Sequence, residues 1–156
     1  HAWVCDITYV RIRKGFVYLF LITDAYSRKI VGWELSNSLG LEGALRSLGM
    51  AIRQCPCPEG LIHHSDRGSQ YCSAIYQDEL QANHIQPSMT DGYDCYQNAL
   101  AERMNGILKN EYLLAKPANI EQATKMVDES VNIYNSRRPH LALKYKTPDE
   151  VHRAFY

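Results

Sequence analysis

The chain has 156 residues, the length of one domain, and 46% hydrophobic and 22% charged residues, as expected of a folded globular protein. These values exclude a wholly disordered or collagen-like chain. Basic and acidic residues number 17 each, so the net charge is zero and any surface that binds nucleic acid must be local. The longest apolar run, Phe16–Thr23, is much shorter than the roughly 20 residues of a membrane span.

The five cysteines include no CxxC pair, which favours reduced thiols in a cytoplasmic protein over a disulfide framework. Cys55 and Cys57 are interpreted as part of a surface turn, because structural zinc ligands are usually separated by roughly two to four residues. The chain has no initial methionine, and its first strand pattern begins at Trp3. We therefore expect a single catalytic-type domain, residues 1–156, taken from a longer protein.

The first third of the chain predicts three antiparallel strands. Residues alternate over Trp3–Val10, and a run of β-forming residues follows over Phe16–Thr23 after a polar turn. A second turn at Asp24–Arg28 leads to a third strand over Lys29–Ser36. We expect these strands to form a meander.

Helices and short strands alternate after this meander. Apolar residues at helical spacing predict a helix over Leu39–Arg53, which Pro56 ends. This order predicts an α/β fold, a mixed sheet with helices on both faces. The other expected elements are strands at Leu61–His64 and Ile85–Ser88, a loop at Thr90–Gln97, and helices at Tyr76–Asn83, from an Asn98 N-cap to near Pro117, at Glu121–Tyr134 and from Asp149.

Three carboxylates stand where a carboxylate is unusual. Asp6 lies within a strand, a position from which aspartate is depleted, and Asp66 directly follows a short apolar strand. Glu102 lies about one turn into a predicted helix. Carboxylates that converge repel one another unless a cation neutralises them, and oxygen ligands of this kind select Mg²⁺ or Mn²⁺. Two such ions about 4 Å apart support in-line displacement at phosphorus, which is nuclease or strand-transfer chemistry.

Polar and basic residues accompany these acids. Lys109 follows Glu102 by seven residues and falls on nearly the same helix face, where it is predicted to contact DNA phosphate. Asn98 and Asn105 are expected near Lys109 on the same helix and are predicted to bind DNA with it. Residues 137–156 form a basic, turn-rich segment with a net charge of +3, in which Arg137 and Arg138 are predicted to position a duplex.

Each of these residues has a simpler interpretation when taken singly. Asp66 resembles a turn residue, Glu102 a solvated helix residue, and Lys109 a surface lysine. His63 and His64 are interpreted as packed or capping histidines rather than metal ligands. The remaining candidates are interpreted as turn acids and surface tyrosines: Asp24, Asp91, Asp94, Tyr93 and Tyr96.

Five segments, in this order, resemble the retroviral-integrase-type core of bacterial insertion-sequence transposases. Asp66 and Glu102 are separated by 35 residues, which matches the Asp, Asp, 35 residues, Glu spacing of that family. Lys109 matches the basic residue expected two turns later. The segments are Trp3-Val-Cys-Asp-Ile-Thr-Tyr9, Asp24-Ala-Tyr-Ser-Arg28 with Ile30-Val-Gly-Trp33, His64-Ser-Asp-Arg-Gly-Ser-Gln-Tyr71, Asn98-Ala-Leu-Ala-Glu102, and Tyr134-Asn-Ser-Arg-Arg-Pro-His140.

The resemblance implies a ribonuclease-H-like fold, a mixed five-stranded sheet flanked by helices. It also implies that Asp6, Asp66 and Glu102 are a metal-binding catalytic triad, with a two-metal site when DNA is bound, and that Lys109 contacts DNA. Members cut DNA at transposon ends by metal-assisted hydrolysis, and the freed 3′ hydroxyl then attacks a target strand. The implied protein is a cytoplasmic enzyme that acts on nucleoid DNA as a homo-oligomer.

The sequence departs from the family in two ways. Gln97 stands where members often carry aspartate, and the helix-turn-helix region that recognises transposon ends is absent from this chain. We therefore expect the isolated domain to bind DNA weakly and without sequence choice. Two alternatives remain open at this point, a stand-alone nuclease of the same fold and an inactive DNA-binding or dimerisation module.

Overall fold

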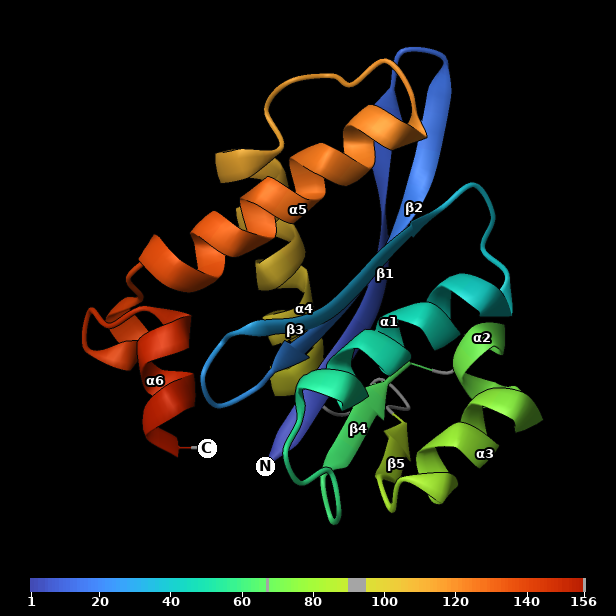
Figure 1. Cartoon of the computed structure of the whole chain (residues 1–156), viewed down its shortest axis with the longest axis vertical. Helices are drawn as coiled ribbons and strands as arrows, with labels where there is room; N and C mark the ends of the chain where they lie inside the picture. Colours follow the sequence, from blue (N-terminus) through green and yellow to red (C-terminus); the bar gives the residue numbers. More distant parts are fainter. Residues whose placement is uncertain (67, 90–94, 156) are drawn as a thin grey trace.

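The computed structural model describes residues 1–66, 68–89 and 95–155, without the side chains of residues 95–98. Its centre is a five-stranded sheet with the strand order β3-β2-β1-β4-β5 (Figure 1). The strands are β1 (Ala2–Ile12), β2 (Gly15–Asp24), β3 (Ile30–Ser36), β4 (Ile62–Ser65) and β5 (Gln86–Met89).

The first three strands form the predicted antiparallel meander, and β4 and β5 lie parallel to β1. The mixed five-stranded sheet is thereby confirmed. The helices are α1 (Leu41–Gln54), α2 (Ser69–Cys72), α3 (Ala74–Ala82), α4 (Cys95–Ile107), a π-helical turn η1 (Leu108–Tyr112), α5 (Ile120–Arg137), a 3₁₀ turn η2 (Leu141–Leu143) and α6 (Pro148–Phe155).

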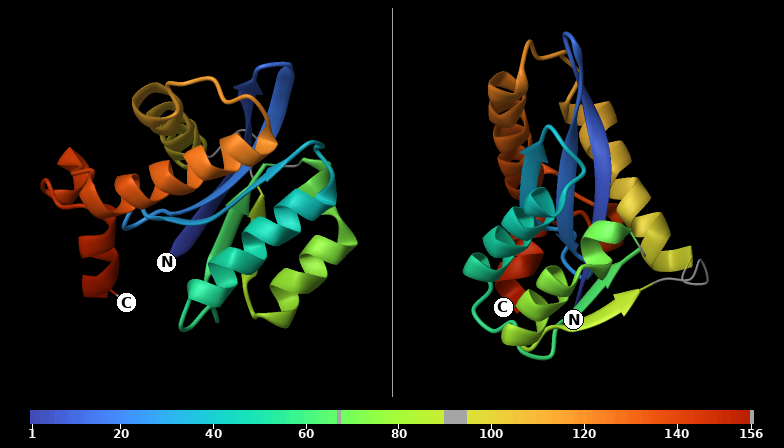
Figure 2. Two further views of the ribbon diagram at one scale, coloured as in Figure 1. Left: turned by 45° about the horizontal axis from the view of Figure 1, so that its top comes forward. Right: turned by 90° about the vertical axis from the view of Figure 1, so that its right-hand side faces the viewer.

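Helices cover both faces of the sheet, as the sequence predicts. Helices α1 and α3 lie over one face and α4 and α5 over the other (Figure 2). Strand β2 shows why its run is continuously apolar: Phe20 and Ile22 pack towards α1 and α3, whereas Leu19 and Leu21 pack towards α4 and α5. Successive side chains of a strand point to opposite faces, so a strand covered on both sides needs apolar residues at every position.

The turn between β2 and β3 is built on Asp24, which is buried. Its carboxylate accepts hydrogen bonds from the backbone N–H groups of Tyr26, at 2.9 Å, and Ser27, at 2.8 Å. This is an Asx turn, so the interpretation of Asp24 as a turn residue is confirmed. Asp91 and Asp94 lie outside the described residues.

Helix α5 is fastened to this turn by two residues of the Tyr-Asn-Ser-Arg-Arg-Pro-His segment. The Asn135 side chain accepts a hydrogen bond from the Ile30 N–H and donates one to the Ile30 carbonyl, at 2.9 and 3.0 Å. The Tyr134 hydroxyl donates to the Arg28 carbonyl at 2.7 Å. These contacts join residues more than 100 positions apart, so part of this motif is structural.

Helix α4 differs from the prediction at both ends. It begins at Cys95, so Asn98 lies inside the helix and the prediction of an Asn98 N-cap is wrong. A preference for one capping residue is weaker than the packing that extends a helix, and boundaries from sequence commonly shift by a turn. At its other end the helix continues as η1, where the Leu113 N–H donates to the Leu108 carbonyl at 2.8 Å. Residues 90–94 of the expected loop lie outside the described residues.

Three further observations concern the cysteines, the possibility of a membrane-spanning helix, and the short helix α2. Cys5, Cys55, Cys57 and Cys72 are free thiols. In the described residues, no helix has both the length and the hydropathy that crossing a bilayer requires. The short helix α2 was not expected, because four residues carry no readable periodicity.

Replacing Gly32 by alanine should destabilise the fold, because a Cβ there would overlap the backbone carbonyl of Ser47 in α1. We expect Gly32→Ala to lower the free energy of unfolding by at least about 2 kcal/mol, measured by urea denaturation. Gly49→Ala on α1 is the control, since its new Cβ would meet the mobile end of Arg53. It should be neutral or stabilising by up to about 1 kcal/mol. Equal stabilities of the two variants would contradict the close approach of α1 to β3.

Candidate active site

Asp6 lies in the middle of β1, the central strand, opposite Leu21 of β2. Its side chain is half-buried and shares a face of the strand with Val4 and Val10, the face that α4 covers. The Asn105 amide of α4 donates a hydrogen bond to the Asp6 carboxylate at 2.6 Å. This bond fixes α4 against the strand that carries the first acid.

Asp66 follows β4, and the pairing of β4 with β1 sets its position. The parallel register pairs Ala2 with Ile62 and Val4 with His64. Asp6 lies two residues beyond Val4 within β1, and Asp66 lies two residues beyond His64, directly after β4 ends at Ser65. The pairing thereby brings Asp66 near Asp6, close enough for its charge to act on the Asp6 carboxyl.

The Asp66 carboxylate is exposed and accepts a hydrogen bond from the Gly68 N–H at 2.8 Å. A Cβ at residue 68 would lie 2.9 Å from the same carboxylate oxygen. The glycine therefore leaves space for the carboxylate while its backbone orients it. Asp66 is both a turn residue and a candidate ligand, so the two interpretations do not exclude each other.

The third candidate acid, Glu102, lies on α4. It is exposed and lies three residues before Asn105, so the two share a helix face, and Asn105 contacts Asp6. Burial raises the pKa of the Asp6 carboxyl above its usual value. Hydrogen bonds from the Ile7 backbone and from Asn105 lower that pKa, and the charges of Asp66 and Glu102 raise it again. Asp66 and Glu102 therefore lie near enough to Asp6 for their charges to act on its carboxyl.

The chemistry of these donors fits a divalent cation. Carboxylate and amide oxygens are the ligands that Mg²⁺ and Mn²⁺ prefer. The Asn105 side-chain oxygen is buried and makes no hydrogen bond within the described residues, so it is an acceptor still available beside Asp6. In the described part of the chain, no three His, Cys, Asp or Glu side chains are close enough together to enclose an ion.

His63 is a packed residue, as the sequence analysis interprets it. Its ring is buried, with Nε2 lying 3.0 Å from the Cys5 sulfur and 2.7 Å from the Tyr76 hydroxyl. Burial lowers the pKa of His63 to about 4. His64 Nδ1 lies 3.2 Å from the Ser88 hydroxyl and joins β4 to β5.

Lys109 lies beyond Asn105 in η1, and its ammonium group is 3.9 Å from the centre of the Tyr9 ring. This cation–π contact holds Lys109 against β1. Nothing in the sequence pattern indicates Tyr9 as the partner of Lys109. Asn98 lies in α4, and its side chain is outside the described residues.

Arg138 has a structural partner that the sequence did not reveal. Its guanidinium donates two hydrogen bonds to Glu111, at 3.0 and 2.9 Å, which joins the segment after α5 to η1. The hydrogen bond from Arg138 also lowers the pKa of Glu111. Arg137 is exposed at the end of α5. Contacts of both arginines with DNA remain a prediction.

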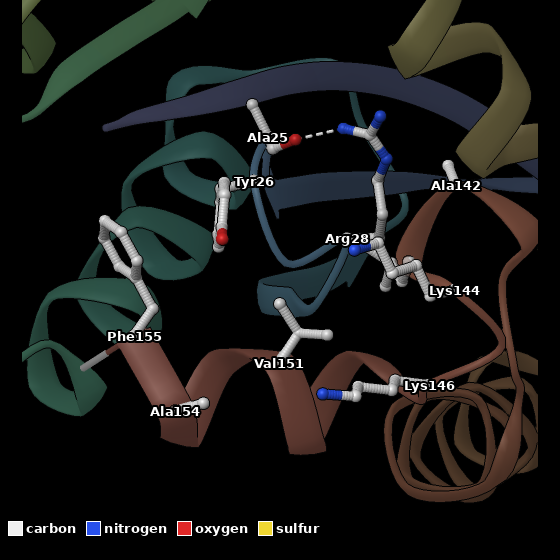
Figure 3. Close-up of a pocket in the computed structure, with 10 residues that line it drawn as sticks. Ala25, Tyr26, Arg28, Ala142, Lys144, Lys146, Val151, Ala154 and Phe155 are labelled. Atoms are coloured by element: carbon white, nitrogen blue, oxygen red, sulfur yellow. Dashed lines mark hydrogen bonds between the residues drawn. The ribbon is translucent and has the colours of Figure 1, made fainter.

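A hollow of about 510 Å³ lies away from the three acids, between the β2–β3 turn and α6 (Figure 3). Its lining includes Arg28, Lys144 and Lys146 together with the rings of Tyr26 and Phe155. None of Asp6, Asp66 and Glu102 lines this hollow, so its size gives no reason to place the chemistry there.

The fold is that of retroviral integrase cores. The catalytic core domain of HTLV-2 integrase, solved in complex with magnesium in a trimeric form, superposes with a TM-score of 0.77 at 22% identity over 97% of this chain and 95% of that chain. The core domain of BIV integrase superposes with a TM-score of 0.74 at 14% identity over 100% and 99% of the two chains. The expected ribonuclease-H-like class is thereby confirmed.

Sequence comparison gives the family. The integrase core domain family matches residues 1–95 and, in a second profile, residues 83–148. The transposase for insertion sequence element IS629 of Shigella sonnei is 37% identical over 99% of this chain and 52% of its own length. The putative transposase for IS986/IS6110 of Mycobacterium tuberculosis (strain ATCC 25177 / H37Ra) is 37% identical over 99% of this chain and 58% of its own length. The chain belongs to the integrase core domain family.

The chain spans a little over half the length of these relatives. The three candidate acids, Asp6 on β1, Asp66 directly after β4 and Glu102 on α4, all lie within it.

Acidification should destabilise the protein through His63. The pKa of His63 is about 4 in the folded protein and about 6.5 in the unfolded chain. The stabilisation from its neutral ring is therefore complete above pH 6.5 and is lost as the pH falls towards 4. Between pH 7 and pH 5 the free energy of unfolding should fall by about 2 kcal/mol on this account. His63→Gln should flatten this dependence in urea denaturation, whereas His84→Asn, at an exposed histidine, should not. The same pH slope in both variants would contradict the assignment.

Proposed function

We propose that this chain is the metal-dependent catalytic core of a transposase, which cleaves DNA at the ends of a mobile element and joins the 3′ ends to target DNA. The observation that supports the proposal is the proximity of three acids from distant parts of the chain: Asp66, directly after β4, and Glu102, on α4, lie near enough to Asp6 on β1 for their charges to raise its pKa. The relatives named as transposases, and the integrase core whose description includes magnesium, support the same activity.

Asp6, Asp66 and Glu102 would hold the cations, with the free oxygen of Asn105 beside them. When bound, two Mg²⁺ or Mn²⁺ ions activate the attacking oxygen and neutralise charge on the leaving oxygen. The chain does the positioning: Asn105 holds the Asp6 carboxylate by a hydrogen bond, and the Gly68 N–H holds that of Asp66. Lys109 lies in η1, which continues the helix that carries Glu102, and is proposed to bind a DNA phosphate.

The reaction needs no covalent protein intermediate. A water molecule first displaces the 3′ oxygen at the element's end, which leaves a free 3′ hydroxyl, and that hydroxyl then displaces a 3′ oxygen from a target phosphodiester. Each step forms one P–O bond and breaks another, so no nucleotide energy source is required. We further propose that the protein acts on nucleoid DNA in the cytoplasm as a homo-oligomer.

Asp66→Asn should reduce metal-dependent joining of a labelled transposon-end oligonucleotide to a target duplex by at least about a hundredfold, because it removes one of the negative ligands. Asp78→Asn, which neutralises an exposed acid on α3, is the matched control and should join DNA like the unaltered protein. Gel analysis of joined and cleaved products in Mn²⁺ measures both steps.

The same gels separate the alternatives. Metal-dependent cleavage without any joined product would support a stand-alone nuclease. No difference between the unaltered protein and Asp66→Asn would overturn the catalytic assignment and favour an inactive DNA-binding module.

Lys109→Ala should weaken DNA binding without affecting metal binding, because Lys109 is proposed to contact a phosphate and no acid. For a duplex we expect a Kd several-fold higher and a slope of log K against log salt that is shallower by about 0.9. Lys125→Ala, on the exposed side of α5, should leave that slope unchanged. Fluorescence anisotropy measures DNA binding and Mn²⁺ calorimetry measures metal binding; equal loss of both would refute the role.

A further inference from the structure

A basic groove runs from Lys109 to the tip of the β1–β2 hairpin, away from the three acids. It consists of two adjoining hollows, of about 350 and 390 Å³, which both include Tyr9, Arg11 and Lys116 in their lining. The hairpin lies at the end of the molecule opposite α6 (Figures 1 and 2). We call this surface the hairpin groove, defined by Tyr9, Arg11, Arg13, Phe16, Lys109 and Lys116.

The hairpin groove is uniformly positive. Arg11, Arg13, Lys109 and Lys116 line its two hollows, and the described residues of that lining include no aspartate or glutamate. Because the whole chain has no net charge, this concentration is a local feature and not a reflection of composition. A row of cations without counterions is complementary to a polyanion.

Aromatic rings lie beside these cations and are open to solvent. Tyr9 is 47% exposed and Phe16 is 52% exposed. Their ring centres are 5.7 Å apart, and Phe16 is 5.4 Å from Tyr18 in a further edge-to-face contact. Exposed rings among cations form the surface that unpaired nucleic-acid bases stack on, whereas paired bases in a duplex present no free ring face.

The groove is preformed. The Arg13 N–H donates a hydrogen bond to the Pro117 carbonyl at 2.9 Å, which ties the segment after η1 to the hairpin. At the other end of the hairpin groove, the cation–π contact with Tyr9 holds the Lys109 side chain in place. Binding a strand there would require little ordering of the protein backbone.

The groove lies within reach of the acids along β1. Tyr9 is three residues beyond Asp6, or about 10 Å along the strand, and Arg11 is about 17 Å beyond it. Both alternate with Asp6 and so leave the other face of the strand, but in the described residues β4 pairs with β1 only as far as Val4, which leaves that edge of β1 open for a strand to pass around. Phosphates of one strand repeat about every 3.4 Å along B-DNA and farther apart when the strand is extended. A strand whose scissile phosphate lies at Asp6 would therefore reach the groove within a few nucleotides.

We propose that the hairpin groove binds a single-stranded stretch of DNA next to the reacting end, with phosphates on Arg11, Arg13 and Lys116 and bases stacked on Tyr9 and Phe16. The proposal rests on the proposed function, because that function supplies DNA as the substrate. It adds a binding surface outside the acid site and specifies an unpaired strand as its ligand.

The test measures the binding of fluorescein-labelled dT20 by anisotropy in EDTA, so that its outcome does not depend on catalysis. Arg11→Gln/Lys116→Gln should raise the Kd about tenfold or more and make the salt slope shallower by about 1.4, as expected for two lost contacts to a single strand. Phe16→Leu keeps an apolar side chain but removes the ring. It should raise the Kd for dT20 about fivefold or more, with a 20-base-pair duplex unaffected.

Lys144→Gln/Lys146→Gln is the matched control. Like the test variant it removes two positive charges, but from the hollow beside α6 (Figure 3), and it should change the Kd for dT20 by less than twofold. Equal losses of affinity for dT20 in the two double variants would show diffuse electrostatic binding and overturn the proposal. Unchanged dT20 binding by Phe16→Leu would also overturn it. A protein that joins no DNA but shows the expected losses would refute the proposed function while retaining the groove.

Discussion

The parallel register between β1 and β4 is the constraint on which the site depends. Because Val4 pairs with His64, Asp66, which directly follows β4, is brought near Asp6. A slip of one residue would turn the side chains of β4 to the opposite face and move Asp66 relative to Asp6. The third acid depends on this register too, since α4 is positioned by the hydrogen bond from Asn105 to Asp6.

Bringing these acids together has an electrostatic cost that the chain offsets only in part. Burial and the two neighbouring carboxylates raise the pKa of Asp6, and hydrogen bonds from Ile7 and Asn105 oppose them. Basic residues gather elsewhere, in the lining of the hairpin groove and of the hollow beside α6, neither of which includes Asp6, Asp66 or Glu102. This separation fits the proposal that the acids bind metal ions and the basic side chains bind DNA phosphates.

Local patterns predicted much of the fold. Alternation and apolar runs identified the meander and the short strand before Asp66 because those signals need only neighbouring residues. The three acids were identifiable for a related reason: aspartate is unusual within a strand, and the spacing from Asp66 to Glu102 matched a known family. The start of α4 was placed three residues too late, since capping preference is a weak local signal.

The sequence by itself determined which residue types were available, the order of the elements and the identity of the three acids. Only the tertiary structure decided which side chains meet. Arg138 pairs with Glu111 and Asn105 holds Asp6, two contacts that the sequence did not predict, while the DNA contacts predicted for both residues stay predictions. Both contacts join residues far apart in the chain, where periodicity and propensity carry no information, and depend on how α4, η1 and α5 pack on the sheet.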